Sequence, residues 1–171
     1  MVINSKHLSD THILYSETER TSLSEYDRKK AAQIKRGDVL IYTTGAYIGL
    51  ANTYNCDEKA LASNHVNILR LKTSSVDSNY LALVINSIIG KLQIEKYSRG
   101  SAQLELYPLD IDKFLIPILE ESEMKEIGDL VKSSLKSELT AKDLLDKITE
   151  KTELLLEEAA SKKEKYRIIY E

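Results

Sequence analysis

The chain has 171 residues, of which 42% are hydrophobic and 30% are charged, and its formal net charge at pH 7 is −3. This length fits one domain, or one domain with an appendage, and the apolar fraction is sufficient to build a core. There is no membrane-length apolar run and no signal peptide, and the single cysteine excludes an internal disulfide and a cysteine-only zinc site, so the composition predicts a cytoplasmic protein.

The first segment of the chain predicts loops, short strands and one short helix. The helix lies within residues 22–34, with Ser22 or Ser24 as its N-cap. It carries a basic run formed by Arg28, Lys29 and Lys30. Such a run is equally consistent with a solvated helix face and with a patch that contacts phosphates.

Residues 37–54 predict a β-hairpin whose first strand is apolar and whose turn contains Gly45, which permits the chain to reverse. The turn carries Thr43, Thr44 and Tyr47. Threonine is common in strands and the tyrosine could belong to the core. The alternative is a rigid tip that displays hydroxyl groups for recognition. No acid, base or metal site adjoins this turn, so it favours recognition over catalysis.

A further strand is predicted after the polar residues Asn64 and His65, because apolar side chains alternate there. A helix over residues 79–97, capped by Asp77 or Ser78, follows from apolar residues at three- and four-residue steps. Its broad apolar face predicts that this helix is buried.

The loop Ser-Arg-Gly-Ser-Ala-Gln at residues 98–103 is a second candidate for recognition. Arg99 can form two hydrogen bonds with guanine or contact a phosphate, and Gln103 can form two hydrogen bonds with adenine. Ser101 can reach a phosphate oxygen. The competing interpretation is a solvated connection between a helix and a strand.

After this loop, residues 107–114 predict one helical turn, and residues 114–118 predict a short edge strand that contains Pro117. We therefore expect residues 1–120 to form an α+β domain with a small twisted sheet and one buried helix.

From residue 121 onward Glu, Lys and Leu dominate and no proline occurs, which predicts a helix from 122 to about 167. Apolar and small residues at alternating steps of four and three form a heptad seam. The seam consists of Ala141, Leu145, Ile148, Thr152, Leu155 and Ala159. A helix of this length cannot bury its seam against so small a domain. Residues 121–171 therefore predict a coiled coil with a second copy or with a partner.

Catalytic signatures are missing from the sequence. His7, His12 and His65 lack metal-ligand spacing, and no glycine-rich cofactor loop follows a strand. Pro108 and Asp110 faintly resemble the Pro-Asp pair of a nuclease metal motif, but Leu109 separates them. We expect no enzymatic activity, no cofactor and no metal in this chain.

The motifs also occur in an informative order. A Gly-Asp-Val-Leu hairpin precedes a short strand, a helix, a Gly-Ser-Ala-Gln loop and an Ile-Pro-Ile-Leu-Glu-Glu passage into a long helix. Over roughly residues 26–150, this order resembles the target recognition domain of a type I restriction-modification specificity subunit. The chain departs from the family pattern in lacking a glutamine near Ser122 and a second proline at Leu119.

The resemblance implies sequence-specific recognition of double-stranded DNA without catalysis, by half of a specificity subunit or a truncated one. The family's partners are an adenine methyltransferase subunit, which brings S-adenosylmethionine chemistry, and a restriction and motor subunit. One recognition domain with one helix implies a homodimer that reads a split, palindromic target. The expected DNA-contacting residues are Thr43, Thr44, Tyr47, Asn64, His65, Arg99, Ser101, Gln103, Arg28, Lys29 and Lys30.

The rival interpretation is a coiled-coil assembly adaptor that does not bind DNA. The net charge of −3 favours it slightly, because DNA attracts basic proteins.

Overall fold

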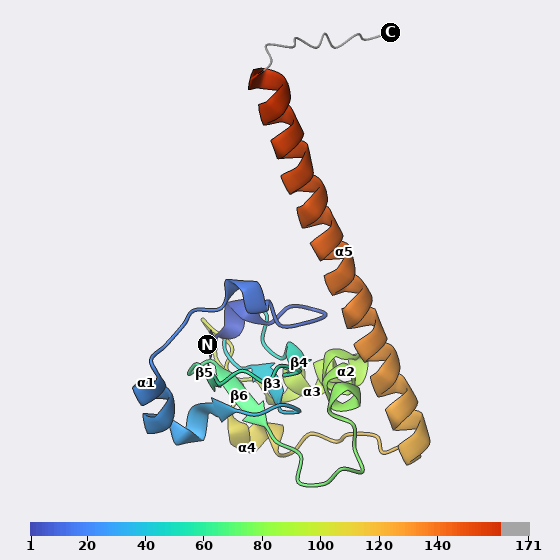
Figure 1. The fold of residues 1–171 in the computed structure, drawn as a ribbon. Coiled ribbons are helices and arrows are strands. Elements are labelled where there is room, and N and C mark those ends of the chain that lie inside the picture. The colour runs from blue at the N-terminus through green and yellow to red at the C-terminus, as the bar shows by residue number, and fades with distance from the viewer. Residues whose placement is uncertain (162–171) are drawn as a thin grey trace. The chain divides into compact units, whose positions relative to one another are not determined.

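The computed structural model describes residues 1–161 (Figure 1). The chain forms two compact units, Met1–Lys132 and a second unit that begins at Ser133. The strands are β1 Val2–Ile3, β2 Gln33–Ile34, β3 Val39–Tyr42, β4 Ala51–Thr53, β5 Ala60–Ala62 and β6 Val66–Leu69. The α-helices are α1 Leu23–Arg28, α2 Ser78–Asn86, α3 Ile88–Tyr97, α4 Pro108–Ile111 and α5 Glu121–Ser161. Three short 3₁₀ helices are η1 Ser5–His7, η2 Tyr15–Glu17 and η3 Lys30–Ala32. The fold is α+β with a long C-terminal helix, as predicted.

The central sheet is antiparallel and has the order β4-β3-β6. Side chains of β3 alternate between its faces: Val39 and Ile41 enter one cluster, while Leu40 and Tyr42 contact the other. Both faces of the strand are therefore buried, which explains its continuous apolar sequence. The outer edge of β4 is covered by Asn86, whose side-chain amide exchanges hydrogen bonds of 2.9 and 2.7 Å with the backbone of Ala51.

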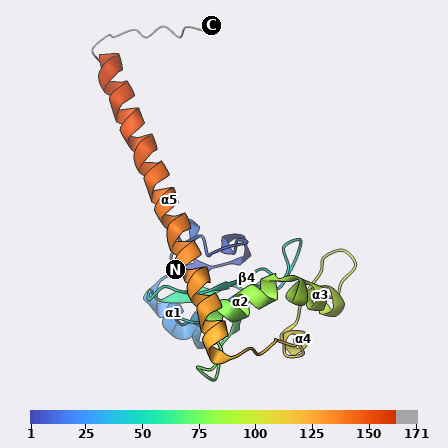
Figure 2. The same cartoon turned by 90° about the vertical axis from the view of Figure 1, so that its right-hand side faces the viewer.

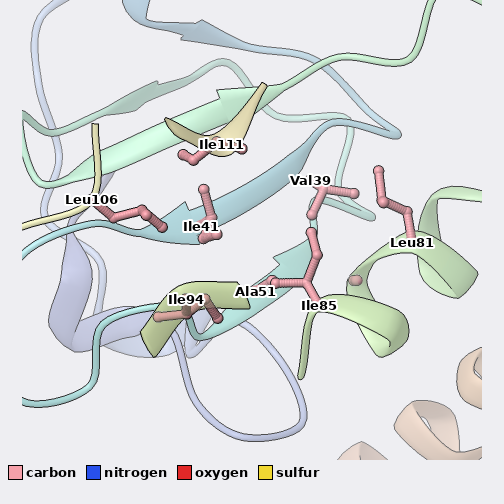
Figure 3. Packing of buried hydrophobic residues seen from close by; sticks show 9 residues of the cluster. Val39, Ile41, Ala51, Leu81, Ile85, Ile94, Leu106 and Ile111 are labelled. Atoms are coloured by element: carbon pink, nitrogen blue, oxygen red, sulfur yellow. The ribbon is translucent and has the colours of Figure 1, made fainter. Parts of the chain in front are cut away.

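One face of this sheet packs against α2, α3 and α4 (Figure 3). The cluster consists of Val39, Ile41, Ala51, Leu81, Ala82, Ile85, Ile94, Leu106 and Ile111. The opposite face packs against the N-terminal segment and a second sheet of order β1-β5-β2. Strand β5 was not predicted from the sequence. This strand is only three residues long, so its pattern is too short to distinguish it from a loop.

The single helix predicted over residues 79–97 is wrong, because the chain breaks at Ser87 into α2 and α3. The backbone N–H of Ser87 closes α2 by donating to Leu83 and Val84, and its hydroxyl accepts from Ile89 to begin α3. A Cβ atom at Gly90 would lie 1.9 Å from the carbonyl oxygen of Ile85, so only glycine allows α3 to start this close to α2.

The strand predicted at residues 114–118 is also wrong, since this segment is irregular. A side chain supplies the hydrogen bonds that a neighbouring strand would have supplied. Gln93 accepts from the N–H of Leu115 at 2.6 Å and donates to its carbonyl oxygen at 3.0 Å. The helical turn predicted just before it is confirmed as α4. Of the two caps predicted for the first helix, Ser22 is the one found, and this helix ends at Arg28.

The predicted C-terminal helix is confirmed from Glu121 to Ser161, and its predicted end near residue 167 lies outside the described residues. Its first turns belong to the first compact unit, because Met124 is buried against Tyr80 and Val84 of α2. The predicted division at residue 120 thus falls before the end of this unit at Lys132.

Within the second unit, the larger apolar side chains of the predicted seam are more than half exposed, for example Leu145 at 63% and Ile148 at 60%. The coiled coil itself stays a prediction. Between residues 1 and 161, no helix combines the length and apolar character needed to cross a membrane.

Candidate nucleic-acid interface

Three polar loops meet where β3 ends. The N–H of Thr43 donates to His65 at 3.0 Å, and the carbonyl oxygen of Thr43 accepts from Leu106 at 2.9 Å. The N–H of Gly45 donates to Leu104 at 2.9 Å. Figure 2 shows the loops before β4 and after α3 side by side. We call the surface formed by residues 43–47, 63–65 and 99–107 the tip surface.

The loop that contains Arg99 is closed by its own backbone. Arg99 and Glu105 exchange two main-chain hydrogen bonds, of 2.9 and 2.7 Å, and the residues between them form the apex. Gly100 has φ +121°, and a Cβ atom there would lie 2.1 Å from the carbonyl oxygen of Gln103. Ser101 and Gln103 are exposed at this apex, so they are held in place by a closed loop and face solvent.

The hairpin turn presents only some of its predicted contact residues. Tyr47 is 71% exposed and Thr44 is partly exposed. Thr43 is 6% exposed, so its prediction as a DNA contact is corrected: its backbone joins two loops, and its side chain is enclosed. Asn64 and His65 are both exposed beside it.

The charge at the tip surface is organised around a buried acid, Asp110 in α4. Its Oδ1 atom accepts from Nη2 of Arg99 at 2.8 Å and from Nζ of Lys113 at 2.7 Å. The hydrogen bond from Lys113, with the nearby Arg99 charge, lowers the pKa of Asp110. Nearby, Tyr107 donates to Glu105, and this hydrogen bond raises the pKa of the tyrosine. Arg99 and Lys113 balance the charges of Asp110 and Glu105, so this cluster carries no formal net charge.

The basic run at residues 28–30, which extends from the end of α1 into η3, does not join this surface. Figure 2 shows α1 on the left, whereas α3 and its flanking loops lie on the right. Arg28 and Lys29 form ion pairs with Glu25 at 2.7 and 3.0 Å, which offsets part of their charge. Phosphate contact by Arg28, Lys29 and Lys30 stays a prediction, and it would require a patch separate from the tip surface.

Two buried acids were not predicted as structural anchors. Asp110 was considered only as the acid of a faint nuclease motif, which was rejected because Leu109 separates it from Pro108. Asp38, also buried, accepts two hydrogen bonds from Arg70, at 2.7 and 2.6 Å, and one from the N–H of Lys35 at 2.7 Å. An acid directly before a fully apolar strand was the available signal for Asp38. Among residues 1–161, no group of His, Cys, Asp and Glu is arranged to hold a metal ion.

The family model described as type I restriction modification DNA specificity domain matches residues 2–150 of the chain. Among solved structures, the HsdS subunit from Thermoanaerobacter tengcongensis is 19% identical with a TM-score of 0.59, and the match covers 94% of this chain and 42% of that one. A chain from work on complex assembly and conformational transition of the type I R-M system is 18% identical with a TM-score of 0.60, again covering 94% and 42%. These two matches show a shared fold, and this chain spans less than half of either. No curated protein sequence matches the chain.

Proposed function

The chain belongs to the family of type I restriction-modification DNA specificity domains, and we propose that it reads a DNA sequence through the tip surface. In this proposal the chain is not an enzyme. It directs an adenine methyltransferase subunit, and through the assembled complex a restriction subunit, to the sequence that it reads.

The observation that carries this proposal is the convergence of three loops on one end of the sheet. Tyr47, His65 and the pair Arg99 and Gln103 come from three separate loops, which are joined by main-chain hydrogen bonds, and all four side chains are exposed. Arginine and glutamine are the side chains that match guanine and adenine edges. Because the loops are already ordered, little conformational entropy is lost when these side chains meet DNA.

The charge of the chain indicates how tightly it binds alone. Residues 1–120 carry 14 basic and 14 acidic residues, so this part is neutral. Most of the affinity for DNA comes from neutralising phosphates, and it weakens steeply with salt. We therefore propose that the isolated chain binds weakly and that the methyltransferase partner supplies much of the phosphate contact.

The long helix supports a second part of the proposal, that two copies associate. Leu145, Ile148 and Leu155 are each more than half exposed on α5. Exposed leucines at heptad spacing are stabilised when a second helix covers them. The match also covers 42% of each solved chain, so two copies would approach the length of one. A two-fold dimer of this kind would read a split, palindromic target.

A map of methylated adenines in the host genome tests the proposal. Deletion of the gene should abolish methylation at one set of sites, and Arg99→Ala or Gln103→Ala should change which sites are methylated. Arg20→Ala is the control, because its side chain is 83% exposed and forms only a 3.7 Å pair with Glu58. An unchanged map after deletion would refute the specificity role.

The same experiment separates the assembly-adaptor alternative, which the lack of net positive charge in residues 1–120 and the exposed leucines of α5 also support. An adaptor would still self-associate through Leu145 and Ile148, but its deletion would leave methylated adenines unchanged. Recovery of an adenine methyltransferase with the tagged full chain favours the specificity role. Recovery of assembly partners without one favours the adaptor.

A further inference from the structure

Asp110 connects the apex loop to the body of the domain. Its carboxylate is 2% exposed, whereas the side chain of Arg99 that it binds is 65% exposed. One end of the arginine is thus anchored in the interior while much of the side chain faces solvent. The acid is eleven positions along the chain from the arginine, on a different element.

The anchor itself is held rigidly. Pro108 begins α4, and the N–H of Asp110 donates to Tyr107 at 2.9 Å. The next residue, Ile111, belongs to the main hydrophobic cluster. Movement of the carboxylate would therefore disturb core packing, so its position is fixed before any ligand binds.

We infer that Asp110 is a positioning residue for sequence reading, which orients the guanidinium of Arg99 so that its remaining N–H groups meet a guanine. This inference rests on the proposed function, in which the tip surface reads DNA. An arginine carries five N–H donors in a planar fork, and the contact with Asp110 occupies a donor on Nη2 only. Guanine recognition needs two donors in a fixed direction, so an arginine held by a buried acid discriminates better than a free one.

Lys113 provides a matched comparison within the same cluster. Its Nζ atom binds the same oxygen of Asp110 at 2.7 Å, and its side chain is half exposed. It also lies 5.7 Å from the centre of the Tyr97 ring. As a point charge it contributes to phosphate attraction, but it lacks the fork that reads a base edge.

A repulsive role and a positioning role for Asp110 predict different effects of Asp110→Asn on the sequence preference. If the acid only repels DNA, its removal strengthens binding to every sequence and leaves the preference unchanged. If it positions Arg99, its removal strengthens non-specific binding through the freed positive charge but weakens the choice of guanine. The preference and the salt dependence therefore have to be measured together.

The experiment uses the full chain assembled with its methyltransferase subunit and a pool of random-sequence DNA duplexes as the probe. Arg99→Ala should lose the preference for one guanine by roughly 5- to 150-fold. Asp110→Asn should lose at least about fivefold at the same position, while the slope of log K against log salt steepens by up to about 0.9. Lys113→Met should keep the preference and reduce that slope by about 0.9.

Arg99→Lys tests the same idea without altering the anchor. A lysine keeps the charge and can still pair with Asp110, but it cannot form the two-pronged contact, so the guanine preference should fall while the salt slope is unchanged. Wild-type preference in either Asp110→Asn or Arg99→Lys overturns the inference. Wild-type preference in Arg99→Ala instead refutes the role of this loop in the proposed function, so the two failures are distinguishable.

Discussion

Met124→Ala tests how the long helix is fixed to the globular unit. Met124 is 2% exposed and packs against Tyr80 and Val84 of α2. One turn later, a Cβ atom at Gly128 would lie 2.4 Å from Oδ1 of Asp77, the N-cap of α2. This close contact prevents the helix from moving inward to fill a cavity, so the space left by alanine should stay largely open.

The magnitude follows from the atoms removed. Methionine loses three heavy-atom groups on truncation, worth about 0.8 kcal/mol each, or about 2.4 kcal/mol in total. The unfilled cavity raises the loss in the free energy of unfolding to about 3 kcal/mol, within the range for such substitutions. For a unit of 132 residues, an unfolding entropy of about 2.1 cal/mol/K per residue converts this into a fall in Tm of roughly 10 °C.

Thermal unfolding followed by tyrosine fluorescence or near-ultraviolet circular dichroism measures this loss, since the chain has ten tyrosines and no tryptophan. Leu130→Ala is the matched control, because Leu130 lies on the same helix but is 65% exposed. It should change the free energy of unfolding by less than about 0.5 kcal/mol. Equal Tm values for the two variants would refute the assignment of Met124 as the residue that fixes the helix.

Three further outcomes are expected. Arg70→Met should lower the free energy of unfolding in urea by about 2–4 kcal/mol, because it leaves the buried carboxylate of Asp38 without its charge partner. Adding Asp38→Asn should restore part of this loss. If the losses of the two single variants simply add in the double variant, the reasoning is contradicted. Burial lowers the pKa of His7 below 6.5, so the Tm should fall as the pH drops below about 6.5 toward the lower folded-state pKa. His7→Gln should reduce this dependence of Tm on pH. An equal dependence in the variant and the wild type would exclude His7 as its source. Leu145→Ser combined with Ile148→Ser should abolish self-association in sedimentation, whereas a monomeric wild type at high concentration would count against the coiled coil.

Local signals in the sequence predicted those elements whose own residues determine them. Ser22 caps α1 through its hydroxyl, and α5 follows from a long run without proline. The break at Ser87 was hidden because apolar spacing continues across it, from Ile85 to Ile88 and Ile89. Periodicity reports which face is apolar, and it does not report that a new helix axis begins.

Only part of the candidate site was predicted, because local sequence identifies side-chain chemistry and does not identify tertiary contacts. Arg99 and Gln103 were identified by their chemistry, and the structure brings their loop beside the hairpin turn and His65. The burial of Thr43 and the bond between Arg99 and Asp110 depend on tertiary packing between distant segments, which no local pattern encodes. The strand expected around Leu115 failed similarly, because a side chain, Gln93, replaced a neighbouring strand.

The loops of the tip surface are tied to one another by main-chain atoms, so the exposed side chains contribute little to folding. Substitutions at Tyr47, His65 or Gln103 should alter stability by less than about 0.5 kcal/mol. Gly100 is an exception, because its left-handed backbone and its contact with Gln103 admit no side chain. A scaffold built in this way can accept different side chains on its exposed surface while its architecture stays intact.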